Sequence, residues 1–143
     1  MKHPPHMLTV MTPFPYSINA EASLADAQAL MDQHGFGHLP VTRNDDIAGL
    51  LSERDLQRAH LLGHPLTAEE ELKVGDICSP RPYICDVSDP LARVLEVMAE
   101  KRLDAVLVLK EGEMVGIFTA IDACRVLAET INEQFAVQDD IVA

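Results

Sequence analysis

Two motifs in this chain combine a glycine, a hydroxyl and a carboxylate at the same spacing. Gly49-Leu50-Leu51-Ser52-Glu53-Arg54-Asp55 and Gly116-Ile117-Phe118-Thr119-Ala120-Ile121-Asp122 both follow the pattern Gly-x-x-[Ser/Thr]-x-x-Asp. A hydroxyl with an acid three residues later is typical of a capping box, in which the two side chains bond free backbone N–H groups at a helix start. A helix start also attracts phosphate through the same N–H groups and the helix dipole. The motifs therefore indicate helix caps, sites for a sugar phosphate, or both.

The two motifs belong to a longer internal repeat. They are offset by 67 residues (122 minus 55), and the same offset aligns Met11-Thr12-Pro13 with Cys78-Ser79-Pro80 without a gap. Between residues 11 and 60, ten positions are identical to their partners: Pro13, Pro15, Tyr16, Leu24, Ala25, Met31, Val41, Gly49, Asp55 and Arg58. Ordinary composition would give ~3–4 chance matches. The chain therefore uses one structural unit twice, which predicts two similar sites.

Each copy predicts the order strand, helix, strand, strand, helix. In the first copy we expect a strand over 16–18, a helix over 23–34 capped by Gly35, a hairpin of 38–42 with 47–51, and a helix over 52–62. In the second copy we expect a helix with Pro90 at its first position, strands over 105–109 and 114–118, and a helix opened by Thr119 with Ile121, Val126 and Leu127 on its apolar side. Pro40 is expected to put its strand at a sheet edge or near a strand end. Residues 63–76 are expected to link the copies.

Composition limits what such a chain can bind. Its 143 residues carry a formal net charge of −12 and are 48% hydrophobic, which suits a packed core but opposes binding to a nucleic-acid backbone. No apolar run approaches the ~20 residues that span a membrane, and residues 1–10 lack the apolar core of a secretory signal. Cys78, Cys85 and Cys124 have no metal-like spacing, so we expect reduced thiols in a cytoplasmic protein. His3 and His6 have no carboxylate or cysteine partners in a metal-like spacing, and no metal is expected.

The order of elements, together with the motif that closes each copy, resembles a tandem pair of cystathionine β-synthase (CBS) domains, the arrangement called a Bateman module. The resemblance spans about residues 8–136 and also includes Val10-Met11-Thr12 and Gly75-Asp76-Ile77-Cys78, which open the copies, and His38-Leu39-Pro40-Val41. It implies a mixed α/β (α+β) fold of two β-α-β-β-α repeats packed with pseudo-two-fold symmetry. The repeats would span residues 8–65 and 72–136 and form one CBS pair in stand-alone form.

The resemblance also implies a function. Such modules bind adenosine-containing ligands (AMP, ADP, ATP, S-adenosylmethionine) in clefts between the repeats, and binding changes the shape of a partner. The chain is then a regulatory module for a separate, unknown protein, without catalytic activity and with no required cofactor. The alternative is a scaffold or interaction protein of the same fold with no bound nucleotide. A homodimer is expected through the last helices, whose candidate apolar residues are Leu56, Ala59, Ala123 and Val126.

The resemblance assigns roles within each motif. It implies that Asp55 and Asp122 contact the ribose hydroxyls, while Ser52 and Thr119 face the phosphate or the ribose. Capping and ligand binding are compatible, because the aspartate can cap the helix when the site is empty.

Other candidate residues have two readings each. Gly49 and Gly116 interrupt apolar strands, which indicates either tight packing or close approach of a ligand. Tyr16 and Tyr83 occupy equivalent positions, where they either stack on a purine or belong to the core.

The copies differ in their basic residues. His38 and Arg54 are candidates for phosphate contact in the first copy, although His38 also fits an ordinary strand end. Ala105 and Ile121 replace them in the second copy, and Asp104 replaces a glycine. We therefore expect two unequal sites, of which at most one binds tightly.

Overall fold

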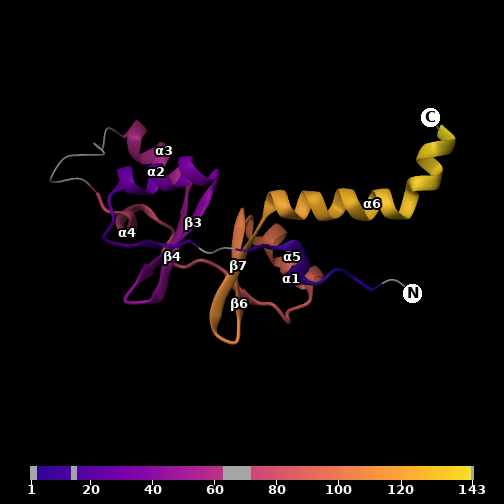
Figure 1. Ribbon diagram of the computed structural model, residues 1–143, viewed down its shortest axis with the longest axis horizontal. Coiled ribbons are helices and arrows are strands. Elements are labelled where there is room, and N and C mark those ends of the chain that lie inside the picture. The colour runs from indigo at the N-terminus through magenta and orange to yellow at the C-terminus, as the bar shows by residue number, and fades with distance from the viewer. Residues whose placement is uncertain (1–2, 14–15, 63–71, 143) are drawn as a thin grey trace. The chain divides into compact units, whose positions relative to one another are not determined.

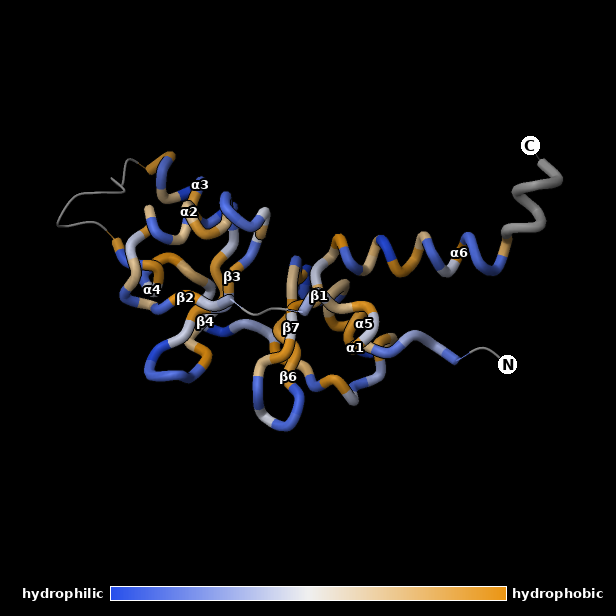
Figure 2. The backbone as a smooth tube through the Cα atoms, viewed as in Figure 1, coloured by the Kyte–Doolittle hydropathy of each residue, from blue (hydrophilic) through white to orange (hydrophobic). Residues whose placement is uncertain are grey.

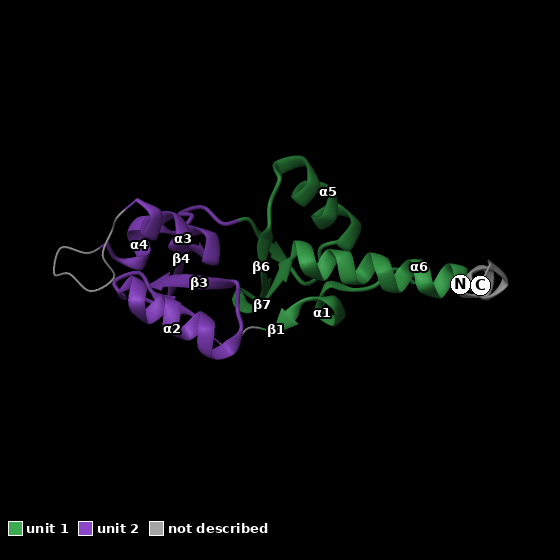
Figure 3. Cartoon of the chain, turned by 90° about the horizontal axis from the view of Figure 1, so that it is seen from above, with its two compact units in different colours: residues 1–14, 83–143 green, residues 15–82 purple. Residues whose placement is uncertain are grey.

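The computed structural model describes residues 3–13, 16–62 and 72–142, with side chains as far as Phe135 (Figure 1). The chain divides into two compact units, coloured separately in Figure 3: residues 15–82, and residues 1–14 together with 83–143. Each unit contains one β-sheet with helices, which confirms the predicted mixed α+β class. In the part of the chain described, no helix combines the length and the apolar character needed to cross a bilayer.

The unit of residues 15–82 is built on a three-stranded sheet in the order β2-β3-β4. Its elements are β2 (Ile18–Asn19), α2 (Leu24–His34), β3 (His38–Arg43), β4 (Asp46–Ser52), α3 (Glu53–Leu61) and α4 (Val74–Ile77). β2 pairs with β3 in parallel, and β3 and β4 form the predicted hairpin. The hairpin turns through Asn44 and Asp45, both with positive φ, as a two-residue turn between right-twisted strands requires.

The other unit has a four-stranded sheet in the order β1-β7-β6-β5. Its elements are α1 (Met7–Val10), β1 (Thr12–Pro13), β5 (Ile84–Asp86), α5 (Leu91–Lys101), β6 (Ala105–Lys110), β7 (Glu113–Thr119) and α6 (Ala120–Val142). The hairpin of β6 and β7 repeats that of β3 and β4. Phe135 lies in α6 with non-helical backbone angles (φ −123°, ψ 16°).

Helix boundaries follow local sequence signals with small shifts. The Ser23 side chain caps α2 by accepting from the Asp26 N–H (3.0 Å), and Gly35 ends that helix at φ 70°. Pro90 is the N-cap of α5 rather than its first helical residue. The predicted strand over 16–18 is also displaced, since β2 begins at Ile18 and leaves Tyr16 outside the sheet.

The expected edge position of Pro40 is wrong, because β3 is the central strand of its sheet. Pro40 lies opposite Leu50, whose N–H and C=O bond Ser79 on the other side of β4 (3.0 and 2.9 Å). The pair is thus one that exchanges no hydrogen bonds. β2 on the far side pairs with β3 only at Val41 and beyond. A proline is tolerated in this central strand because neither neighbouring strand needs an N–H donor at this position.

The segments expected to open each copy instead pack with the other copy. Met7 and Met11 belong to the hydrophobic core of the second copy, together with Phe118, and Thr12 of β1 pairs with Ile117 of β7. In the same way, the Gly75 N–H donates to the Ala20 carbonyl (2.8 Å). The segment from Leu72 onward is therefore structural, while residues 63–71 of the expected linker lie outside the described part of the chain.

Candidate functional site

Both motifs form the expected capping boxes. In the first, the Ser52 N–H donates to Asp55 Oδ2 (2.9 Å) and the Asp55 N–H donates to Ser52 Oγ (3.1 Å). In the second, the Thr119 N–H donates to Asp122 Oδ2 (2.9 Å) and the Asp122 N–H donates to Thr119 Oγ1 (3.1 Å). The capping reading of the motifs is therefore confirmed.

The first N–H group of each capped helix also has a partner. The Glu53 N–H donates to the Gly37 carbonyl (2.9 Å), and the Ala120 N–H donates to the Asp104 carbonyl (2.8 Å). With the third N–H bonded to the cap hydroxyl, two of the first three amides of each helix are used internally. A phosphate at either helix start would compete with these bonds.

The motif glycines permit close packing of the exchanged segments. A Cβ on Gly49 would lie 2.5 Å from the Ser79 carbonyl oxygen and 2.6 Å from Cys78 Sγ. A Cβ on Gly116 would lie 2.7 Å from both Met11 Sδ and the Thr12 carbonyl oxygen. Backbone contact at these distances excludes any side chain without displacement of the segment. Of the two readings offered by the sequence, the structure supports tight packing.

The second carboxylate is enclosed by its own chain. Asp122 is 4% exposed. Besides the Thr119 amide, it accepts from Thr12 Oγ1 (3.2 Å to Oδ1 and 3.3 Å to Oδ2) and from Arg125 Nη1 (3.0 Å to Oδ1). Thr12 comes from β1, which pairs with β7 beside the motif. These three donors occupy the carboxylate that a ribose would need.

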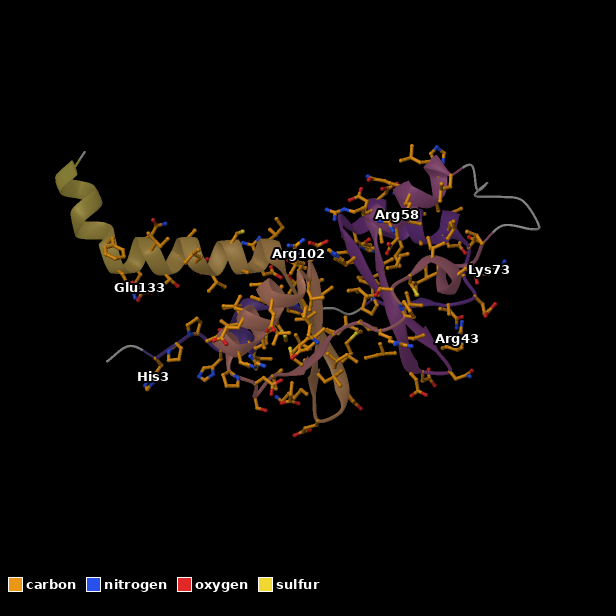
Figure 4. All side chains as sticks on the ribbon, turned by 180° about the vertical axis from the view of Figure 1, so that it is seen from behind. His3, Arg43, Arg58, Lys73, Arg102 and Glu133 are labelled. Carbon is orange, nitrogen blue, oxygen red and sulfur yellow. The ribbon has the colours of Figure 1, made fainter. Side chains whose placement is uncertain are left out.

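The first carboxylate is more open. Asp55 is half-buried and lines a pocket of about 170 Å³ together with Arg58 of α3, labelled in Figure 4, and Ala59, Leu62, Leu72 and Ile77. Burial raises the pKa of the Cys78 thiol, and the charge of the neighbouring Asp55 carboxylate raises it further. The pocket is smaller than the ~300–1,000 Å³ of a complete ligand site, so it suits one part of a nucleoside.

The two tyrosines have structural partners in the described residues. Tyr16 stacks on His34 with ring centroids 4.3 Å apart, and Phe36 lies 5.6 Å from the same ring. The Tyr83 ring packs against the core of its unit, and Lys101 Nζ lies 5.7 Å from its centroid. Both residues precede the strands in which they were expected. Ligand stacking by either ring stays a prediction.

The basic candidates of the first copy lie near its motif. His38 is paired with Ser52 across β3 and β4, so the two side chains emerge on the same face of the sheet. Arg54 is exposed in the first turn of α3. In the second copy, Ala105 is paired with Thr119, so no basic side chain occupies the position of His38.

Three residues that no sequence pattern singled out decide the state of the motifs: Thr12, Ser79 and Arg125. The Arg125 side chain is 60% exposed, yet it forms an ion pair with buried Asp122. Thr12 and Ser79 are repeat equivalents that both carry a hydroxyl, which was a usable signal. Their packing against the other copy could not be read from the repeat itself.

Within the described residues, no group of three or more histidine, cysteine or acidic side chains is placed to hold a metal ion. Cys78, Cys85 and Cys124 are free thiols.

Comparison with known proteins agrees with this geometry. The family model described as "CBS domain" matches residues 8–61 and 74–129. Hypoxic response protein 1 of Mycobacterium tuberculosis is 31% identical over 121 residues, which cover 82% of each chain. A crystal structure of an uncharacterised conserved protein from Pyrococcus horikoshii is 28% identical, covering 87% of this chain and 93% of its own with a TM-score of 0.74.

A second similar structure is a complex with a ligand. The CBS domain of a bacterial CNNM/CorC family Mg²⁺ transporter in complex with ATP is 26% identical, covering 86% of this chain and 87% of its own with a TM-score of 0.71. The matched segments coincide with the two sequence repeats and include both capped motifs. The chain therefore belongs to the CBS domain family, with one CBS domain in each repeat.

Proposed function

We propose that this chain is a regulatory module that binds an adenosine-containing ligand, such as AMP, ADP, ATP or S-adenosylmethionine. The repeats over 8–65 and 72–136 act together as one CBS pair, and the ligand signal passes to a separate partner protein rather than to a catalytic site in this chain. The ATP complex of the CNNM/CorC relative supports this ligand class. The three free thiols fit a reducing compartment, so we place the module in the cytoplasm.

The observation that carries the proposal is the state of Asp55. Its carboxylate caps α3 by accepting from the Ser52 N–H while lining a pocket whose other walls are Arg58 and apolar side chains. A carboxylate of this kind can accept from the two hydroxyls of a ribose, and apolar walls suit a purine. His38, on the same sheet face as Ser52, is our candidate for a phosphate contact.

The second motif is proposed as the weaker site. A ribose at Asp122 must displace the hydroxyl of Thr12 and compete with Arg125, and each replaced bond reduces the net gain from binding. The inequality between the two copies then arises from the enclosure of Asp122 as well as from the loss of His38 and Arg54.

Thermal denaturation with each of the four ligands tests the proposal. A ligand at a hundred times its dissociation constant adds about 2.7 kcal/mol to the free energy of unfolding. For a chain of this size, that raises the melting temperature by several degrees. Asp55→Ala should remove most of this ligand-induced rise. The control is Ser23→Ala, which removes an equivalent cap from α2 and should leave the rise intact.

One observation favours the alternative, a scaffold with the same fold and no nucleotide. The internal bonds at both helix starts and around Asp122 leave few unsatisfied groups at the motifs. The same experiment decides between the two, because a melting temperature unchanged by all four ligands would establish the scaffold reading.

We further propose that the module is a symmetric homodimer.

A further inference from the structure

We propose that the homodimer forms through one face of α6, which pairs with α6 of a second copy. The face consists of Ile121, Cys124, Ala128, Ile131 and Phe135, and we call it the α6 stripe. The inference rests on the homodimer of the proposed function and names its surface. It does not depend on ligand binding.

The spacing of the α6 stripe is that of a helix-pairing seam. Its residues follow one another at intervals of three, four, three and four, the a/d pattern of two-stranded helical contacts. None of the five is charged. Figure 2 shows hydrophobic and hydrophilic residues alternating along α6, as expected for a helix with one apolar face.

All five residues of the α6 stripe are exposed. Ile121 exposes 68% of its surface, Ile131 46% and Phe135 43%, and Leu127 beside the stripe exposes 60%. Within its own unit, the C-terminal part of α6 extends beyond α5 and the sheet in the views of Figures 1 and 3. No described residue of that unit therefore covers the stripe.

The area of this face agrees with a dimer interface. The stripe and Leu127 beside it together present on the order of 500 Å² of apolar surface in each copy. The largest apolar patch on a typical monomer has about this size and is often functional. Burial of both faces removes on the order of 1,000 Å², which reaches the lower bound of specific interfaces.

The residues expected from the sequence to form the dimer contact are used inside the chain. Leu56 and Ala59 are 3% and 5% exposed, and Ala123 and Val126 pack against the core of their own unit. A second copy could reach them only by unpacking that core. Outside α6, the described helices carry two other large exposed apolar side chains, Leu8 on α1 and Leu61 on α3, and the surroundings of Leu61 include Gln28, Gln57 and His60. Each of these is a single side chain, whereas the α6 stripe joins three large apolar side chains on one helix.

Sedimentation equilibrium of the full chain tests the proposal with Ile131→Glu. A carboxylate forced into an apolar seam costs several kcal/mol, so the dimer dissociation constant should rise on the order of 100-fold or more. Leu61→Glu is the matched control, since it places the same charge at a residue that is 84% exposed on α3. Both substitutions lie at exposed positions, and a cooperative thermal transition in each variant would show that both fold.

The reactivity of Cys124 provides a second readout that locates the contact. Cys78 and Cys85 are buried, and burial raises the pKa of the Cys85 thiol to about 11, so Cys124 is the thiol that alkylates first near pH 8. At a concentration about 100-fold above the dimer dissociation constant, Cys124 should react roughly tenfold more slowly in the unsubstituted protein than in Ile131→Glu.

The outcomes separate the surface from the rest of the proposed function. A dimer that Ile131→Glu dissociates and Leu61→Glu does not, with Cys124 protected, supports the α6 stripe. A monomeric unsubstituted protein, or a dimer dissociated only by Leu61→Glu, overturns it. The ligand-induced rise in melting temperature is measured separately on each variant, so a failure of ligand binding is not mistaken for a failure of pairing.

Discussion

Of the two motif aspartates, we expect Asp122 to matter more for stability and Asp55 to matter more for ligand binding. Asp122→Ala removes a helix cap, about 0.5–2 kcal/mol. It also removes the part-buried bond from Thr12, about 0.5–1.5 kcal/mol. The ion pair with the 60% exposed Arg125 adds at most about 1 kcal/mol, because solvent screens it. The midpoints of these ranges add to about 3 kcal/mol, so the free energy of unfolding should fall by about that amount.

Asp55→Ala removes the bond that caps α3, which costs about 1 kcal/mol. At roughly 2–4 °C per kcal/mol for a chain of this size, the melting temperature should fall by about 6–12 °C for Asp122→Ala and about 2–4 °C for Asp55→Ala. Calorimetry or circular dichroism of the ligand-free protein measures both. With ATP added, Asp55→Ala should lose the ligand-induced rise in melting temperature, whereas Asp122→Ala should keep it.

Double-mutant cycles isolate the contact responsible for the difference. The cycle of Thr12→Val with Asp122→Ala should show a coupling of about 0.5–1.5 kcal/mol. The cycle of Ser79→Ala with Asp55→Ala, the equivalent pair of the other repeat, should show none beyond about 0.5 kcal/mol. Equal couplings in the two cycles, or equal losses of stability for the two aspartates, would refute the enclosure of Asp122.

Three further predictions concern residues other than Asp55 and Asp122. Gly49→Ala should lower the melting temperature because its Cβ meets backbone at 2.5 Å, a clash worth about 1–3 kcal/mol, whereas Gly37→Ala, with no atom within 4 Å, should not. Ser88→Ala should raise the pKa of Asp86, because the Ser88 hydroxyl and amide hold this pKa below the ordinary value of 3.8. The stability that Asp86 contributes is present above pH 3.8 and is lost as the pH falls through the lower pKa of the folded state. NMR titration of Asp86 would measure the change. Arg102→Gly should raise the melting temperature, since φ is +56° at this helix end and glycine adopts it without strain.

Local physics explains which elements were predictable from the sequence. Caps, turns and hydrophobic periodicity act over three to four residues, so α2, α3 and both hairpins lie where the pattern predicts them. The capping boxes were predictable for the same reason, because Ser52 and Asp55 meet within one helical turn. Of the apolar positions expected in the last helix, only Val126 packs against the core of its unit, since periodicity identifies an apolar face without identifying its partner. Ile121 and Leu127 are exposed there.

The state of each site depended on contacts that no local pattern encodes. The repeat determined that Asp55 and Asp122 stand at equivalent positions and that both cap a helix. The tertiary structure decided that Asp122 is enclosed, because a hydrogen bond from Thr12 spans 110 residues of sequence. Self-alignment places Thr12 at the opening of the first copy, whereas packing places it in the second. Equivalent residues thus differ in exposure because burial depends on which segment returns to cover them, and that is set by the whole fold.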